Sequence, residues 1–314
     1  MRAIRATVPR SLMQTRDHVT TSATSRIGLG TVQFGTDYGV SNRSGQVSSP
    51  EVAAILGSAH AAGVRVIDTA ASYGSAEEVL GTALSPEQDF AIVTKALPLS
   101  KGFEAIEIRA RRSLELLGRK PAEAILIHAA QDLAGPEGPR LWAMLQRLRD
   151  EGLYRRIGIS AYFADRPLEL ARRYRPDLMQ LPFSLLDQRL RNNGELALLK
   201  QLGIEIHVRS IFLQGLLFMD PMQLPARLAH AGPALAAVQA RITQAGLRPI
   251  EAAIGFVLAQ NDVDIAVVGV TNRDELAQVV AASAKPLPDF DWRLCAIDDP
   301  ITLTPSLWQP DHNR

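Results

Sequence analysis

The sequence of 314 residues contains a single cysteine, Cys295, and only 5% of its residues are aromatic. One cysteine cannot form an intrachain disulfide, and no cluster of cysteine and histidine has the spacing of a metal site. We therefore expect no bound metal. This cysteine usage is compatible with a reducing compartment, and the sequence predicts a cytoplasmic protein.

The sequence also lacks an excess of charge of either sign. It has 34 Lys and Arg residues against 33 Asp and Glu residues, which gives a net charge of +1. Such a chain has no overall field to attract nucleic acid. No apolar run reaches the length of about 18 residues that a membrane-spanning helix needs. Nucleic acid and membranes are therefore not expected partners.

Residues 1–25 have a composition of their own, with several arginines, many hydroxyl residues and one acid, Asp17. This pattern can mark an organellar transit peptide. However, no apolar segment follows, and hydrophobic patterning begins only at Arg26. The sequence therefore favours a flexible N-terminal extension over residues 1–25.

From Ile27 onward, short apolar runs rich in β-branched residues alternate with longer segments of helical period. Eight runs are candidate strands, at residues 26–34, 64–68, 90–95, 124–128, 156–160, 177–181, 203–210 and 264–270. This alternation has no break in composition and predicts a (β/α)8 TIM barrel, a single α/β domain over residues 26–285. Residues 286–314 would form a C-terminal tail that lies over the barrel mouth or around the barrel.

Four polar residues stand at or just after the ends of successive candidate strands: Asp68, Tyr73, Lys95 and His128. Each has an ordinary explanation on its own, such as a helix cap, a packing contact or a buried histidine. The carboxyl ends of parallel barrel strands meet at one rim, however. Their joint occurrence therefore favours a shared site.

These residue types suit proton transfer to a carbonyl oxygen. Tyr73 can donate a proton, and the ammonium of Lys95 can stabilise the phenolate that remains. A salt bridge with Lys95 would satisfy a buried Asp68. His128 can donate a hydrogen bond to the substrate oxygen and orient it. The four residues therefore indicate an enzyme that acts on carbonyl groups.

The same segments resemble the aldo-keto reductases, in particular bacterial members. The resemblance covers about residues 26–282 and is carried by IGLGTVQFG at 27–35, VIDTAASYGSAEEVLG at 66–81, VTKA and LIHAA. It implies that Asp68, Tyr73, Lys95 and His128 are a catalytic tetrad. It also implies NADP or NAD bound in extended form across the barrel mouth. The G-x-G-x-x-G fingerprint of doubly wound folds is absent from this chain.

The resemblance further implies a set of cofactor contacts. Ser160 and Gln180 match positions that bind the nicotinamide amide, and residues 210–215 match a loop whose backbone cradles the pyrophosphate. Gly269, Thr271 and Asn272 match the adenosine phosphate end. The full expected set is Gly30, Thr31, Asp68, Ser160, Gln180, Arg209, Ser210, Leu213, Gln214, Gly215, Gly269, Thr271, Asn272 and Glu275.

Three residues depart from the family pattern. Arg209 stands where an aromatic residue usually stacks on nicotinamide, so its guanidinium would stack there or meet an acidic substrate. Ala161 replaces a common asparagine. Glu275 stands where several NADP-preferring members have arginine, and its carboxylate would repel a 2′-phosphate. Arg273 could compensate, so the preference between NADP and NAD stays open.

Other residues are candidates for a substrate pocket or for ordinary structure. Phe34, Tyr38, Phe183 and Trp308 are expected to line the substrate pocket. The arginines at positions 109, 111 and 112 fall in a helical pattern and are interpreted as the solvated face of a barrel helix.

The sequence therefore predicts an NAD(P)-dependent oxidoreductase that reversibly reduces an aldehyde or ketone. Similarity to bacterial members found with polysaccharide genes favours a sugar-related carbonyl. Two alternatives remain: a cofactor-binding regulatory or redox-sensing subunit with little turnover, and a Schiff-base lyase that uses Lys95. The expected partner is a small molecule, with the protein as a monomer or small homo-oligomer.

Overall fold

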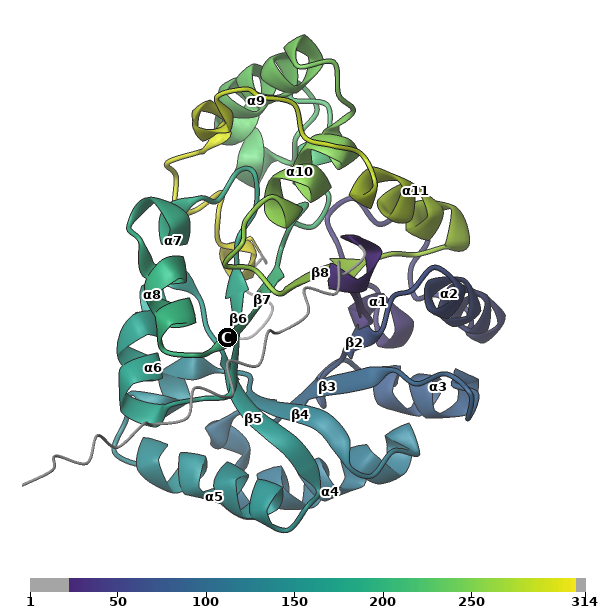
Figure 1. Ribbon diagram of the computed structural model, residues 1–314, viewed down its shortest axis with the longest axis vertical. Coiled ribbons are helices and arrows are strands. Elements are labelled where there is room, and N and C mark those ends of the chain that lie inside the picture. The colour runs from purple at the N-terminus through teal and green to yellow at the C-terminus, as the bar shows by residue number, and fades with distance from the viewer. Residues whose placement is uncertain (1–22, 309–314) are drawn as a thin grey trace, which may run out of the picture.

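The computed structural model describes residues 23–308 and contains a closed barrel of eight parallel strands paired in sequence order. Helices surround the barrel (Figure 1). This is the predicted (β/α)8 fold. The strands are β1 (Ile27–Gly30), β2 (Val66–Asp68), β3 (Ala91–Lys95), β4 (Ala122–Ile127), β5 (Tyr154–Ser160), β6 (Leu178–Pro182), β7 (Glu205–Arg209) and β8 (Ile265–Gly269).

The structure has helices in the segments of helical period and also a short one, Val32–Gly35, where the first strand was expected to continue. They are α1 (Val32–Gly35), α2 (Ser49–Ala61), α3 (Ala76–Ala83), α4 (Phe103–Leu117), α5 (Gly138–Asp150), α6 (Pro167–Tyr174), α7 (Arg189–Asn192), α8 (Glu195–Gln201), α9 (Gly232–Gln244), α10 (Pro249–Leu258) and α11 (Arg273–Ser283). Pro50 in the first turn of α2 needs no hydrogen-bonding N–H there, and the N-cap of this helix is Ser48.

The first strand is shorter than the sequence pattern predicts. The apolar run continues to Phe34, but β1 ends at Gly30. The N–H of Thr31 donates to the carbonyl oxygen of Asp68 at 3.0 Å, and the N–H of Phe34 donates to that of Thr31 at 2.9 Å. These bonds turn the chain into α1, whose Phe34 is buried.

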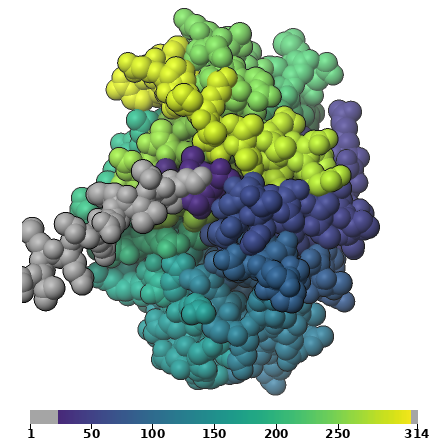
Figure 2. Space-filling view, turned by 45° about the vertical axis from the view of Figure 1, so that its right-hand side comes forward, coloured from purple at the N-terminus to yellow at the C-terminus, as the bar shows by residue number. Residues whose placement is uncertain are grey.

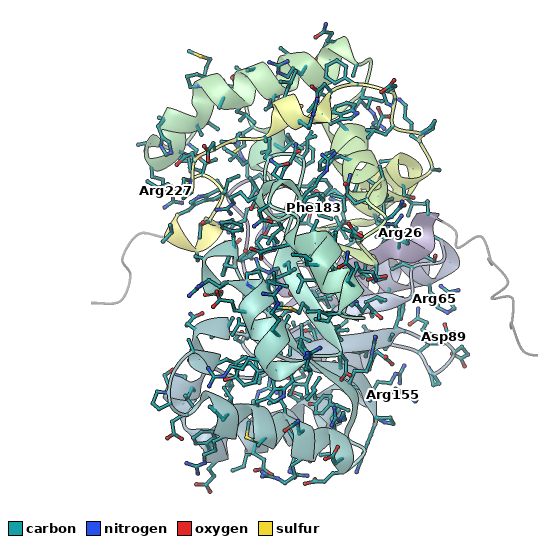
Figure 3. All side chains as sticks on the ribbon, turned by 60° about the vertical axis from the view of Figure 1, so that its left-hand side comes forward. Arg26, Arg65, Asp89, Arg155, Phe183 and Arg227 are labelled. Carbon is teal, nitrogen blue, oxygen red and sulfur yellow. The ribbon has the colours of Figure 1, made fainter. Side chains whose placement is uncertain are left out.

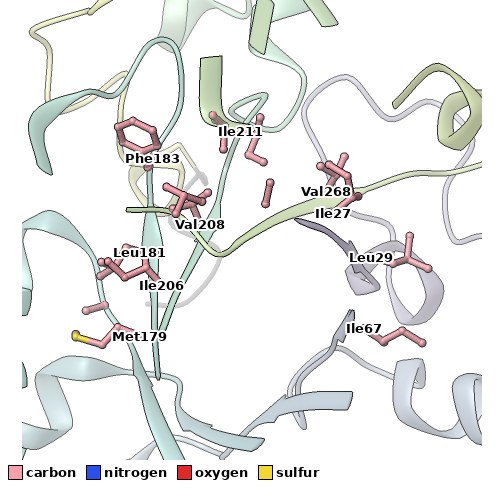
Figure 4. Packing of buried hydrophobic residues seen from close by; sticks show 14 of the residues in the cluster. Ile27, Leu29, Ile67, Met179, Leu181, Phe183, Ile206, Val208, Ile211 and Val268 are labelled. Atoms are coloured by element: carbon pink, nitrogen blue, oxygen red, sulfur yellow. The ribbon is translucent and has the colours of Figure 1, made fainter. Parts of the chain in front are cut away.

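Side chains alternate between the two faces of the barrel wall. Val93, Ala124, Leu126 and Leu178 form a small cluster inside the barrel. The other face packs against the helices, as Figure 4 shows for Met179, Leu181 and Phe183 along β6 and for neighbouring strands. This period of two fixes which strand residues can face the interior.

The amino-terminal face of the barrel carries charged residues. Arg26, Arg65 and Asp89 lie just before β1, β2 and β3, and Arg155 is the second residue of β5. All four appear along one side of the molecule in Figure 3, whereas Phe183 follows the end of β6. Arg26 donates to the carbonyl oxygens of Leu258, Gln260 and Val263 at 2.6–2.8 Å. Most of the predicted extension, residues 1–22, lies outside the described residues.

The segment after α11 crosses the outside of the barrel beside α9, where it is yellow in Figure 2. The side-chain amide of Gln188 donates to the carbonyl oxygen of Trp292 at 2.8 Å. The segment then brings Pro305 and Ser306 to the large cavity described below. Within residues 23–308, no helix is long and apolar enough to cross a membrane.

Candidate active site

A cavity of about 940 Å³ opens at the carboxyl ends of the strands, the usual position of active sites in this barrel. Its size lies toward the upper end of the range of about 300–1,000 Å³ for small-molecule sites. Most of the expected cofactor residues line it: Gly30, Thr31, Asp68, Gln180, Arg209, Ser210, Gln214, Gly215, Gly269, Thr271 and Glu275. Ser160, Leu213 and Asn272 are not among its lining residues.

Lys95 lies at the centre of the four strand-end residues. Its side chain is 1% exposed, and Nζ lies 2.7 and 2.8 Å from the two carboxylate oxygens of Asp68. Nζ also donates to the carbonyl oxygen of Thr69 at 2.9 Å and to the Tyr73 hydroxyl at 3.4 Å. Burial by itself lowers the pKa of Lys95, but Asp68 and Tyr73 outweigh it and the pKa is raised. The amine is therefore a fixed ammonium.

Tyr73 lies in the turn between β2 and α3, and this turn packs closely against α1. A Cβ atom at Gly35 would overlap the carbonyl oxygen of Tyr73, and one at Gly74, where φ is 54°, would overlap the carbonyl oxygen of Gly35. Only glycine permits this approach and this backbone conformation. The two glycines thus hold the tyrosine hydroxyl next to Lys95.

His128 follows β4 and completes the cluster. Its ring centroid lies 5.8 Å from that of Tyr73 in an edge-on arrangement. Burial, and then the charges of Lys95 and Arg209, lowers the pKa of His128 to about 3, so the imidazole is neutral at physiological pH. Nδ1 lies 3.2 Å from the Ser72 hydroxyl. When Ser72 donates this bond, the proton of the ring is on Nε2.

Two buried amide oxygens at the cavity have no hydrogen-bond partner within the described part of the chain. Gln180 donates to Asp68 at 2.6 Å, but its Oε1 is unsatisfied. Oε1 of Gln33, in α1, is also unsatisfied. Buried polar groups normally find a partner. Both oxygens can therefore accept hydrogen bonds from a bound molecule.

The loop after β7 has a strained backbone. Ser210, Leu213 and Gln214 have φ angles of 62°, 46° and 52°, in the left-handed region that non-glycine residues avoid. Such strain persists where surrounding structure imposes it, often at ligand sites. The N–H groups of Leu213 and Gly215 donate to carbonyl oxygens within the loop. Leu213 itself is buried and belongs to the core.

The loop after α1 meets this strained loop across the cavity. Ser41 donates through its backbone N–H at 3.4 Å and through its hydroxyl at 3.2 Å to the carbonyl oxygen of Gln214. The Gln214 side chain donates to the hydroxyl of Tyr38 at 3.1 Å. Burial, followed by Tyr73 and Tyr162, raises the pKa of Tyr38 to about 12. Tyr38 thus presents a protonated phenol to the cavity.

Glu275 has a structural task in addition to its place in the cavity wall. Its carboxylate accepts from the N–H of Thr271 at 2.6 Å, and its own N–H donates to the side chain of Asn272 at 2.9 Å. Asn272 is the N-cap of α11. These reciprocal bonds fix the carboxylate in place. They also explain why the Asn272 side chain is not available to line the cavity.

The interpretation of the arginine cluster needs correction at one position. Arg111 and Arg112 pair with surface glutamates of their own helix. Arg109 instead lies 2.7 Å from the buried Glu77 carboxylate and donates to the carbonyl oxygen of Ala71 at 3.2 Å. Ala71 belongs to the turn that carries Tyr73. Arg109 therefore links the turn that carries Tyr73 to the buried carboxylate of Glu77.

Three of the four residues expected in the substrate pocket are elsewhere. Phe34, Phe183 and Trp308 are at most 2% exposed and belong to the hydrophobic core. Phe183 stacks on Phe256 with ring centroids 5.6 Å apart, and the Trp308 indole N–H donates to the carbonyl oxygen of Ile301 at 2.8 Å. Tyr38 lines the cavity as expected.

A model of the aldo/keto reductase family matches residues 26–297. The chain belongs to this family. An aldo-keto reductase from Mycolicibacterium vanbaalenii is 35% identical over 126 residues, which are 38% of this chain and 44% of that protein. An NADH-specific methylglyoxal reductase from Escherichia coli is 29% identical over 217 residues, which are 62% of this chain and 65% of that protein. The chain thus matches less than two thirds of the length of these relatives.

A solved aldo-keto reductase from Bacillus halodurans, in its holo form, has the same fold. It superposes with a TM-score of 0.69 at 21% identity and covers 86% of this chain and 90% of that chain. Several residues that line the cavity of this chain were not predicted from the sequence: Gln33, Tyr162, Phe218 and Arg248. Gln33 lies within a family-like segment, but nothing in the sequence indicates that its amide oxygen is buried.

Proposed function

We propose that this protein is an NAD(P)H-dependent reductase that converts an aldehyde or ketone to an alcohol, with Tyr73 as the general acid. One observation carries the proposal. A buried ammonium, Lys95 Nζ, is held by Asp68 and lies 3.4 Å from the Tyr73 hydroxyl beside a large cavity. This arrangement suits delivery of a proton to an oxygen that gains negative charge.

Each of the four residues has a role in the proposed reaction. When bound, the nicotinamide supplies the hydride. Tyr73 gives its proton to the carbonyl oxygen, and the Lys95 ammonium stabilises the phenolate. Asp68 keeps that ammonium charged and in position. The neutral His128 can donate a hydrogen bond to the same oxygen and so orient the carbonyl. Alcohol oxidation would use the same groups in reverse.

The cavity residues fit a nicotinamide dinucleotide. The unsatisfied Oε1 of Gln180 can accept from a carboxamide N–H. The hydroxyl of Ser210 and the side chain of Gln214 project from the strained loop that lines the cavity. Phosphate contacts would come from these side chains rather than from the N–H groups of Leu213 and Gly215, which are already bonded.

A Schiff-base lyase is a weaker candidate. That chemistry needs a neutral amine with a free lone pair. Lys95 has a raised pKa, and its Nζ donates to both Asp68 oxygens and to Thr69. A regulatory subunit without turnover is also less well supported, because Asp68, Tyr73 and His128 line the cavity and Lys95 is bonded to the first two.

The function is tested by titrating the purified protein with NADH and with NADPH and measuring the dissociation constants from the change in fluorescence. An aldehyde panel that includes sugar aldehydes is then assayed at the preferred cofactor. We expect binding of at least one nucleotide and turnover of at least one aldehyde. Absence of binding to either nucleotide would refute the cofactor assignment, and binding without turnover would favour the regulatory alternative.

Glu275 is proposed to oppose NADPH through its fixed negative charge. We expect Glu275→Arg to raise the affinity for NADPH relative to NADH by about tenfold or more, because an arginine–phosphate pair replaces repulsion. The measurement is the ratio of the two dissociation constants. Glu275→Gln is the matched control, since it removes the charge but can still accept from Thr271, and it should shift the ratio less. An unchanged ratio in Glu275→Arg would show that this residue does not face the 2′-phosphate.

A further inference from the structure

Arg209 is a half-buried cation at the cavity without a carboxylate partner among residues 23–308. It is the last residue of β7 and lines the cavity. Other partly buried arginines of the barrel have carboxylates close by: Arg109 has Glu77 at 2.7 Å, Arg156 has Glu205 at 2.5 Å and Arg189 has Asp187 at 2.8 Å. Arg26 and Arg119 have no carboxylate but donate to backbone carbonyl oxygens instead, whereas Arg209 has neither kind of partner among the described residues and lies in the cavity wall.

The contacts of Arg209 hold its guanidinium beside Tyr162 but leave most of its N–H groups without a partner among the described residues. Its guanidinium carbon lies 4.3 Å from the centre of the Tyr162 ring. One nitrogen donates a long bond of 3.4 Å to the Ser210 hydroxyl. A guanidinium over an aromatic ring can still direct its paired N–H groups at a planar anion. The side chain is thus held in a receptive geometry before any ligand arrives.

The charges around the cavity leave Arg209 uncompensated near the reacting groups. The two carboxylates in the wall are Asp68, which Lys95 neutralises, and Glu275, which is bonded to Thr271. Arg209 is close enough to His128 to help lower its pKa. A partly desolvated cation is costly without a counter-charge, and a bound anion would remove that cost.

We propose that Arg209 binds an oxoanion of the substrate, so that the preferred substrates are aldehydes or ketones that carry a carboxylate. This inference rests on the proposed reductase function and specifies its substrate class. A phosphate group of the cofactor would offer the same chemistry to a guanidinium. The experiment must therefore separate an anion on the substrate from one on the nucleotide.

The test compares ω-oxo carboxylates, from glyoxylate to 5-oxopentanoate, with their methyl esters. Each pair has the same carbonyl and chain length and differs in charge. We expect kcat/KM for at least one acid to exceed that of its ester by about 10- to 100-fold, as for a hydrogen bond to a charged group. In Arg209→Gln this ratio should fall toward one. Arg209→Lys keeps the charge but loses the paired N–H groups of the guanidinium, so its ratio of acid to ester should be intermediate.

Arg43→Gln is the matched control. Arg43 also lines the cavity and has no carboxylate partner in the described part of the chain, but it is exposed and lies on the loop after α1. We expect it to leave the ratio of acid to ester unchanged. The dissociation constants of NADH and NADPH are measured for every variant.

The outcomes separate the two proposals. Turnover of esters with no preference for any acid would overturn the role of Arg209 and leave the reductase intact. A loss of nucleotide affinity in Arg209→Gln with an unchanged ratio would also overturn it, in favour of a cofactor contact. Failure of every aldehyde and ketone with both nucleotides would refute the proposed function, and the substrate class with it.

Discussion

Tyr73→Phe is expected to lower kcat for carbonyl reduction by about 10²- to 10⁴-fold, the usual contribution of a positioned general acid. Only the hydroxyl is removed, and it lies 3.4 Å from Lys95 Nζ. The ring itself, edge-on to His128, is retained. The dissociation constant of the nucleotide should therefore change by no more than about twofold, because binding does not use the transferred proton. Steady-state kinetics and fluorescence titration give the two quantities.

Tyr162→Phe is the control for this substitution. Tyr162 also lines the cavity, but its described contact there is the stacked Arg209, not Lys95. We expect its loss of kcat to be less than about tenfold, since no transferred proton is removed. Normal turnover in Tyr73→Phe would refute the assignment of Tyr73 as the proton donor. Equal losses in both variants would indicate a general effect on the cavity.

Lys95→Met is expected to lower the free energy of unfolding by about 3–5 kcal/mol, as found when one partner of a buried ion pair is removed. The Asp68 side chain is only 6% exposed and would keep a charge without its counterion. Activity should fall as well, because the phenolate of Tyr73 would lose its stabilising ammonium. Denaturant-induced unfolding measures the change in stability, and single-turnover kinetics measures the change in the chemical step.

Two further variants test whether the loss of stability in Lys95→Met comes from the buried ion pair. Lys200 pairs with Asp264 at 2.7 Å, but the two side chains are 30% and 34% exposed. Lys200→Met should cost no more than about 1 kcal/mol, as for other solvent-accessible pairs. The double variant Asp68→Asn/Lys95→Met should recover much of the lost stability while remaining inactive. If Lys95→Met is no more destabilising than Lys200→Met, the buried pair does not have the proposed importance.

The barrel could be predicted because its signals are local. Each strand is a short β-branched run, and the longer helices have a 3.6-residue apolar period that is read from neighbouring positions. Parallel strands in sequence order then bring their carboxyl ends to one rim. For this reason Asp68, Lys95 and His128, which end or follow successive strands, could be grouped before any contact was known.

Burial of individual aromatic residues could not be predicted in the same way. Phe34 and Phe183 follow strands and were expected in the cavity, yet both are 0% exposed. Whether a side chain after a strand points into the cavity or into the core depends on a turn of one or two residues. For Phe34, the N–H and the hydroxyl of Thr31 both donate to the carbonyl oxygen of Asp68, 37 residues away, at the point where the chain turns from β1 into α1.

The sequence by itself determined the order of strands and helices and the set of polar residues at the strand ends, because both follow from local periodicity and from the geometry of parallel strands. Apart from the Asp68–Lys95 pair, which the sequence predicted, the tertiary structure decided which buried charges have partners. Arg109 meets Glu77 across two helices, whereas Arg209 faces the cavity with no carboxylate among the described residues. Ion pairs of this kind depend on distances between segments far apart in the chain, and no local pattern encodes them.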